Sequence, residues 1–423
     1  MPPAPHYCCF ARILAVCLVI GQAGLAYGLP IPLISRRAPV QYSSHSLFCS
    51  EALAVSVLQQ LNPLAPHKLR ALINRYINWA LEAPGAGPLN AMRSVYSYPF
   101  PVVIELIRNL FLHYPYELFW GWIRPPGLDN AHVPIIERFM KFQEDALPGL
   151  SGFRFRYPTA GANEGIREAF TKLKRDGKTQ IYILQGEYEG YEEVALAHGI
   201  RVIKVDPNQD PAELPAGWWF ISNPSARDGN IIPNEFIRKI CDAGHHVYYD
   251  LAYLGLTDFH AFDLTHPNID GVFVSLSKSF GIFGIRAGFM FSRERVDGLT
   301  GNVWFRSDPA LQVADAILHG IRDPQHLTRL YRPFQTAVVA DLNRLHGLNL
   351  RPSDVVLLAY QKVSDVVGDR QAKVLSRFDR AGVGRLTLTR YFLEMESWKS
   401  LVRIAIFLGL ISPRWRIILP RAA

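Results

Sequence analysis

The stretch that decides the fold is SLSKSFGIFGIRAG, which runs from Ser275 to Gly288. A short apolar run delivers two serine hydroxyls and Lys278 to its end, and a glycine-containing turn then leads to Arg286. Ser275 and the fork-shaped guanidinium of Arg286 are suited to grip a phosphate. A desolvated lysine beside such an anion site is suited to form a Schiff base with an aldehyde. An ordinary exposed lysine would not explain the whole pattern, so the stretch indicates a lysine next to a phosphate site.

From about residue 153 to residue 291, short apolar runs alternate with amphipathic segments. The predicted strands are residues 180–185, 201–205, 218–222, 246–250, 271–275 and 287–291, and the predicted helices are 163–174, 191–198 and 233–242. This alternation predicts a mostly parallel α/β sheet that is covered on both faces. In such sheets ligands bind beyond the carboxyl ends of the strands.

The composition excludes several classes of protein. Hydrophobic residues make up 49% of the 423 residues and charged residues 19%, which excludes a disordered or fibrous chain. The formal charge of +8 favours anionic partners. We find no basic stripe with interleaved aromatics, no zinc-finger spacing and no Cys/His ligand set, so the sequence predicts neither nucleic-acid binding nor a metal site.

The amino terminus carries an uncharged segment over residues 13–35. Its apolar part resembles the central region of a signal peptide, with a possible cleavage site near Gly28. A weak membrane anchor is a further alternative, although Gln22, Pro30 and Pro32 argue against a full span. We favour an incidental leader on a cytoplasmic enzyme, with export as the alternative.

The pattern from Ser275 to Arg286, including two glycines between them, resembles the lysine signature of the class I/II aminotransferases. These are fold-type I enzymes that use pyridoxal 5′-phosphate (PLP). The resemblance implies a seven-stranded, mostly parallel sheet with helices on both faces and a smaller α+β domain. It also implies a Schiff base between Lys278 and the cofactor, a later role for Lys278 in moving protons, and Ser275, Ser277 and Arg286 as phosphate ligands.

Two upstream segments resemble further parts of the family's cofactor site. The turn at Gly161, Ala162 and Asn163 enters a predicted helix, and free amides at a helix start bind phosphate. The resemblance makes these three residues phosphate contacts. In the segment GEYEGY it implies that Tyr188 stacks on the pyridine face and that Tyr191 lines the site.

Asp250 closes a predicted strand and is followed by Tyr253. A carboxylate that faces the pyridine nitrogen keeps it protonated, so that the ring can withdraw electrons. The resemblance implies this role for Asp250, and implies that Tyr253 donates to the phenolic oxygen of the cofactor. It implies a contact from Asn223 to the same oxygen, but an alignment on Gly229 would place Ala226 there instead.

The segment LVRIA resembles the family's carboxy-terminal element, whose arginine pairs with the carboxylate of the substrate. The resemblance therefore implies that Arg403 binds substrate, with a surface arginine as the alternative. It implies a homodimer acting on an amino acid or related amine and a 2-oxo acid.

The predicted function is PLP-dependent transamination, with Lys278, Asp250 and Tyr253 as catalytic residues. The first alternative is a decarboxylase, lyase or cyclase of specialised metabolism on the same fold. The second is a non-catalytic, PLP-binding regulatory protein.

The predicted domains follow the chain in order. Residues 1–44 form the leader, and residues 45–125 form a helical segment that contributes to the small domain. Residues 126–310 form the large PLP-binding domain, and residues 311–423 form the small α+β domain. Within the last of these we expect one long helix over residues 311–345, strands over 354–363 and 386–393, and a helix over 370–381.

Overall fold

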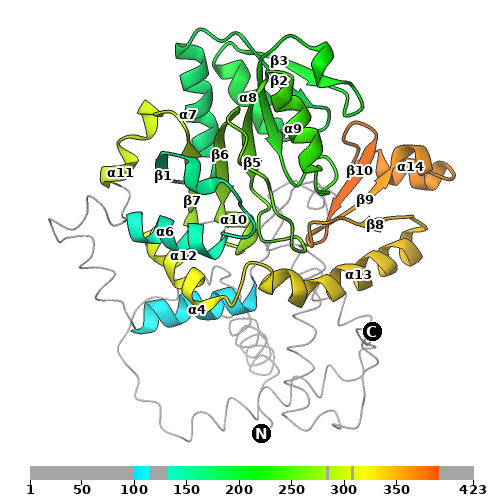
Figure 1. Ribbon diagram of the computed structural model, residues 1–423. Coiled ribbons are helices and arrows are strands. Elements are labelled where there is room, and N and C mark those ends of the chain that lie inside the picture. Colours follow the sequence, from blue (N-terminus) through cyan, green and yellow to red (C-terminus); the bar gives the residue numbers. More distant parts are fainter. Residues whose placement is uncertain (1–99, 114–131, 283–284, 306–308, 377, 390–423) are drawn as a thin grey trace, which may run out of the picture. The chain divides into compact units, whose positions relative to one another are not determined.

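The computed structural model describes residues 100–113, 132–282, 285–305, 309–376 and 378–389 (Figure 1). The predicted leader, most of the predicted helical segment over residues 45–125, and Arg403 lie outside these described residues. The domain boundaries therefore stay predictions. Within the described ranges, no helix is both long enough and apolar enough to cross a lipid bilayer.

A seven-stranded sheet with the order β1-β7-β6-β5-β4-β2-β3 forms the core of the described chain. Its strands are β1 Phe155–Thr159, β2 Gln180–Leu184, β3 Arg201–Val205, β4 Trp218–Ser222, β5 His246–Leu251, β6 Ile269–Ser275 and β7 Gly288–Ser292. Strands β2 to β6 pair in parallel, whereas β7 pairs antiparallel with both β6 and β1. The predicted mostly parallel sheet is confirmed.

The six predicted strands all form, each within two residues of its predicted bounds. Most are nearly continuous apolar runs, which suits strands that are buried on both faces, whereas β3 at the sheet edge carries two exposed charged residues. The sequence analysis missed β1, because its sequence FRYPT contains an arginine and a proline. This strand lies at the edge of the sheet, where Pro158 is tolerated.

Successive residues of β7 show that helices cover both faces of the sheet. Met290 belongs to the core cluster that packs the strands against α7 (Ala162–Arg175). Its neighbours Phe289 and Phe291 lie on α6 (His132–Phe142), with ring centroids 5.0 and 6.1 Å from that of Phe139. Because successive strand side chains point to opposite faces, α7 and α6 cover opposite faces, as predicted.

The other helices of the sheet region are close to prediction. The two that follow strands as expected are α8 Glu189–Ala197 and α9 Asn234–Asp242. The shorter elements are α10 Leu276–Ser279, α11 Asn302–Phe305, and the 3₁₀ turns η2 Leu150–Gly152, η3 Pro211–Glu213, η5 Asp297–Leu299 and η6 Val363–Asp365. A further helix, α4 Pro101–His113, contacts α12 (Pro309–Gly320).

The prediction of one long helix over residues 311–345 is wrong. The chain forms α12 and then a separate helix, α13 His326–His346. Pro324 lies in the break, where its ring and missing N–H oppose a continuous helix. Asp323 stabilises the new start by accepting hydrogen bonds from the Gln325 amide at 3.0 Å and from the Arg329 guanidinium at 2.9 Å.

A second, three-stranded antiparallel sheet has the order β10-β9-β8, with β8 Arg351–Pro352, β9 Leu358–Lys362 and β10 Val383–Thr387. The strand predicted over residues 354–363 therefore begins later, and the one predicted over 386–393 begins earlier. Helix α14 Asp369–Leu375 ends six residues before the predicted helix over 370–381 does. Gln335 of α13 holds this sheet, because its amide donates to the carbonyls of Ser353, Val355 and Leu358 at 2.9, 3.0 and 2.7 Å.

Gly288, the first residue of β7, lies against the turn at Gly161. A methyl group on Gly288 would lie 2.6 Å from the Cα of Gly161 and still closer to the Val274 carbonyl oxygen. Both are backbone atoms, so we expect Gly288→Ala to lower the free energy of unfolding by about 3 kcal/mol, measured by urea denaturation. Gly152→Ala is the control, because its nearest neighbour is an Arg293 side-chain nitrogen at 3.6 Å. Equal effects of the two substitutions would contradict this packing.

Candidate active site

An anion cradle, formed by Gly161, Ser275, Ser277 and Arg286, joins the end of β6 to the turn after β1. Arg286 donates one hydrogen bond to the Ser277 hydroxyl at 3.1 Å and another to the Ala160 carbonyl at 2.8 Å. A Cβ on Gly161 would lie 3.0 Å from the Arg286 Nη2 and 3.4 Å from the Ser275 Oγ. The structure therefore brings the predicted phosphate ligand Gly161 beside the three predicted ligands Ser275, Ser277 and Arg286, from which it is far away in the sequence.

The start of α7 adds backbone donors to this cradle. Helix α7 begins at Ala162, and its N-cap residue Gly161 has a φ of 83° and provides no side-chain cap. A left-handed φ of this kind favours glycine. The first amides of a helix lack internal partners and attract anions. Ala162 is buried, whereas Asn163 is exposed. The two residues therefore fit the predicted phosphate contact through their backbone amides and not through their side chains.

Lys278 lies on α10, three residues after the end of β6, and is half-buried. Its Nζ lies 4.2 Å from the ring centroid of Tyr253, a cation–π contact. Tyr253 is itself 2% exposed and follows the end of β5. The predicted lysine and the predicted phenol therefore face each other.

Asp250 lies in β5 near its carboxyl end and is 4% exposed. Its carboxylate accepts hydrogen bonds from the Tyr191 hydroxyl at 2.9 Å and from the Ala252 amide at 3.0 Å. Burial raises the pKa of Asp250, while the positive charge of Lys278 and these two hydrogen bonds lower it. The site thus holds a buried acid opposite a lysine.

Tyr188 and Tyr191 contact each other edge to face, with ring centroids 5.4 Å apart. Tyr188 is half-buried, and burial raises the pKa of its phenol. Tyr191 is 0% exposed and donates to Asp250, so it supports the carboxylate from behind. This bond gives Tyr191 a supporting role at Asp250, and the expectation that it lines the site stays a prediction.

Asn223 directly follows β4, but its side chain is used within the protein. Its amide nitrogen donates to the Ile232 carbonyl at 2.9 Å and to the Tyr249 hydroxyl at 2.5 Å, and its oxygen accepts from the Ile232 amide at 2.9 Å. These bonds give Asn223 a structural use, and its contact with a cofactor stays a prediction. Ala226 has no polar side chain to replace it.

The sequence analysis missed a buried carboxyl, Glu187, which is 4% exposed. It accepts hydrogen bonds from the Ser222 amide at 3.3 Å and from the Ser222 hydroxyl. Burial, and to a smaller extent the charge of Asp250, raise the pKa of Glu187 to about 7. No pattern marked this residue, because a glutamate in a turn normally indicates solvent exposure.

Two arginines of the three-stranded sheet region were also missed. Arg385 in β10 is 5% exposed and donates to the Ala226 carbonyl. Burial lowers the pKa of Arg385, while the nearby Tyr253 and Glu187 raise it. Arg380 donates to the carbonyls of Gly186 and Ala226 at 3.3 and 3.2 Å. These bonds tie the smaller sheet to the loops after β2 and β4.

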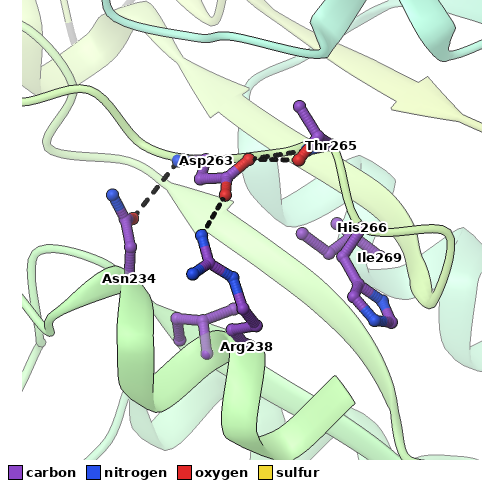
Figure 2. Close-up of a pocket in the computed structure, with 7 residues that line it drawn as sticks. Asn234, Arg238, Asp263, Thr265, His266 and Ile269 are labelled. Atoms are coloured by element: carbon purple, nitrogen blue, oxygen red, sulfur yellow. Dashed lines mark hydrogen bonds and ion pairs between the residues drawn. The ribbon is translucent and has the colours of Figure 1, made fainter. Parts of the chain in front are cut away.

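Two cavities lie outside this arrangement. A cavity of about 90 Å³ beside α9 is lined by Arg238 and Asp263, which form an ion pair at 2.9 Å. Figure 2 shows these lining residues. This cavity includes Ile269, the first residue of β6, and so lies at the opposite end of that strand from Ser275. A larger cavity of about 370 Å³ adjoins Glu187 and Arg380. Among the described residues, no group of three or more His, Cys, Asp or Glu side chains could hold a metal ion.

Part of the chain matches a known protein family. Residues 157–340 match the model of the family described as aminotransferase class I and II. No curated protein matches the chain.

Solved structures share the fold at low identity. A double mutant of Thermus thermophilus aspartate aminotransferase is 16% identical, with a TM-score of 0.53, over 78% of this chain and 98% of that one. L-threonine-O-3-phosphate decarboxylase from Porphyromonas gingivalis is 15% identical, with a TM-score of 0.52, over 74% and 99%. A PLP-bound C-S lyase from Staphylococcus hominis is 14% identical, with a TM-score of 0.52, over 77% and 93%. These structural similarities show the predicted fold. They leave the reaction open, because the three enzymes are an aminotransferase, a decarboxylase and a lyase.

The family match implies PLP as the cofactor, as predicted from the sequence. The residues present fit this group. The anion cradle suits its phosphate, and a side chain at Gly161 would fill that cradle. The Lys278 amine suits its aldehyde, and Asp250 suits its ring nitrogen. Residues 157–340 of this chain therefore match the aminotransferase class I and II family of PLP-dependent enzymes, as the sequence resemblance indicated.

Proposed function

We propose that the protein is an aminotransferase that acts on an amino acid or a related amine through Lys278. The observation that carries this proposal is the convergence of Lys278, Tyr253 and Asp250 beside the anion cradle. The Nζ of Lys278 lies 4.2 Å from the Tyr253 ring centroid, and Asp250 is buried next to this pair. A lysine, a phenol and a carboxylate at one sheet edge supply the groups that the reaction needs.

PLP, when bound, supplies an aldehyde that captures amines and a ring that withdraws electrons from the substrate. The chain's own residues then have separate tasks. The anion cradle of Gly161, Ser275, Ser277 and Arg286 would hold the phosphate, and Tyr188 would pack on the ring. Asp250 would keep a proton on the ring nitrogen, because that proton would stabilise its buried negative charge.

Lys278 is the residue that moves a proton at the reacting carbon. It lies on a short helix after β6, where its amine lies over the Tyr253 ring at the end of a flexible stem. Tyr253 is buried, so its ring limits water around that amine. A general base in a dry site is more effective than the same base in water.

Lys278→Ala is expected to abolish covalent attachment of PLP and to lower turnover roughly a thousandfold or more. The measurement is borohydride reduction of the protein with PLP, followed by peptide mapping and by assay against a panel of amino acids and 2-oxo acids. The wild-type protein should carry the reduced label on Lys278. Full turnover in Lys278→Ala, or a label on another lysine, would refute the assignment.

Arg286→Lys is expected to weaken PLP binding by about 10- to 100-fold. A lysine keeps the charge but loses the fork that bonds both Ser277 and Ala160, and charge-assisted hydrogen bonds contribute about 1.5–3 kcal/mol each. Titration of the apoprotein with PLP, followed by absorbance, measures the change. The matched control is Arg238→Lys at the far end of the sheet, which should bind PLP as the wild type does.

A second arginine, Arg385, is an alternative to Arg403 as the residue that binds the substrate carboxylate. Arg385 is buried and electrostatically coupled to Tyr253, which itself faces Lys278. We propose Arg385 for this role, since a bidentate arginine is the preferred partner of a carboxylate.

Arg385→Lys should raise the KM for the amino acid by about 10- to 100-fold, with a smaller change in PLP affinity. Arg403→Lys is the comparison. A large rise in KM for Arg403→Lys alone would return the role to the residue that the family resemblance indicates.

A decarboxylase or lyase on the same frame is the second candidate. The observation that favours it is the departure at Asn223, whose amide is engaged by Ile232 and Tyr249. Product analysis separates the two reactions. An aminotransferase converts the cofactor to its amine form and needs a 2-oxo acid to regenerate it, whereas a decarboxylase or lyase turns over without one.

We further propose that the protein is a homodimer, which light scattering would test.

A further inference from the structure

Glu187 is a buried acid that the proposed reaction does not use. It lies in the turn between β2 and α8, directly before the ring-stacking Tyr188, and is 4% exposed. A buried carboxyl is costly unless it is well bonded, so its position calls for an explanation.

The carboxyl of Glu187 reaches the strand next to Asp250. It accepts hydrogen bonds from the Ser222 amide at 3.3 Å and from the Ser222 hydroxyl. The same hydroxyl accepts from the Ala226 amide at 2.7 Å, which directs its own hydrogen to Glu187. Ser222 is the register partner of Asp250 across β4 and β5. Glu187 therefore holds the residue beside the acid of the site.

On its other side, Glu187 is joined directly to Tyr188, the next residue of the turn before α8. The Tyr188 ring lies directly on Gly190, where a Cβ would come within 2.5 Å of the ring Cζ, and it meets the Tyr191 ring edge to face. The carboxyl that holds Ser222 thus belongs to the residue next to the ring that we propose stacks on the cofactor.

Several charged groups surround this carboxyl. Asp250 is close enough to raise the pKa of Glu187, and Glu187 in turn raises the pKa of Tyr191 and of the Arg385 guanidinium in β10. Arg380 donates to the Glu187 carbonyl at 3.5 Å. The Ser225 hydroxyl lies 3.5 Å from the Glu187 Oε1. The charge of Glu187 therefore affects the pKa of other groups around the site.

We propose that Glu187 is a positioning residue of the cofactor site, which acts on Asp250 through Ser222 and on Tyr188 through the turn they share. The inference rests on the proposed function. It predicts that loss of the carboxyl disturbs the cofactor rather than only the fold.

The test compares Glu187→Ala and Glu187→Gln with the wild type. Glu187→Ala loses the hydrogen bonds from the Ser222 amide and hydroxyl and should weaken PLP binding about tenfold. Glu187→Gln keeps an oxygen for Ser222 and should stay within about threefold of the wild type. Glu193→Gln, on an exposed position of α8, is the matched control and should bind PLP unchanged.

The pH dependence of the bound cofactor's visible absorption supplies a second readout. Removal of a nearby negative charge lowers the pKa of a cationic group. The pH at the midpoint of the absorption change should therefore be lower in both Glu187 variants than in the wild type. A merely structural role would leave the midpoint in place. Wild-type affinity and midpoint in both variants would overturn the proposal.

Unfolding of the apoprotein gives a readout that does not depend on the cofactor. Glu187 has a pKa of about 7 when folded against a reference value of 4.5, so the native state holds the proton longer. As the pH rises from 4.5 to about 7, the free energy of unfolding of the wild type should therefore decrease relative to that of Glu187→Gln. Parallel pH profiles would contradict a buried carboxyl at this place. Borohydride labelling of Lys278 in every variant separates failure of this inference from failure of the proposed function.

Discussion

The carboxylate of Asp250 is the charge on which the arrangement of the site depends. It is 4% exposed, and an ionised carboxylate at that depth needs partners. Tyr191 and the Ala252 amide donate to it, and the positive charge of Lys278 favours its ionised form. Each of these groups has its place because the acid must be kept charged without water. In the proposed function, a pyridinium nitrogen would add a second positive partner to that of Lys278.

The sheet topology explains how distant segments meet around this acid. Strands β4, β5 and β6 are parallel, so Ser222, Asp250 and Ser275 lie at or near their carboxyl ends along one edge. Strand β7 runs the other way, and its first residue, Gly288, is therefore the register partner of Ser275. Strand β1 is antiparallel to β7, so its end also pairs with Gly288 and delivers the Gly161 turn to the same edge. Two reversals of direction thus assemble the anion cradle.

The sequence was most informative where burial is uniform or a motif is long. The buried strands are nearly continuous apolar runs, and their positions were predicted within two residues. The pattern from Ser275 to Arg286 named residues that the structure does bring together. Prediction was weaker where a local rule was outweighed by context, as in β1 with its proline at a sheet edge. It was also weaker at Pro324, where an otherwise helical pattern breaks.

Buried charges were the part of the site that the sequence did not reveal. Glu187 and Arg385 look like surface residues by type, and only the fold shows that they are 4% and 5% exposed. Glu187 lies in the turn after β2 and Arg385 lies in β10 of the smaller sheet, and the charge of Glu187 raises the pKa of Arg385. Asn223 gives the opposite case, because its motif indicates a ligand while its bonds to Ile232 and Tyr249 give it a structural use. A family resemblance locates the residues that bind the cofactor, but the residues that support them depend on which side chains this particular chain has buried. The supporting acid and arginines are therefore where this protein differs most from what its motif alone would predict.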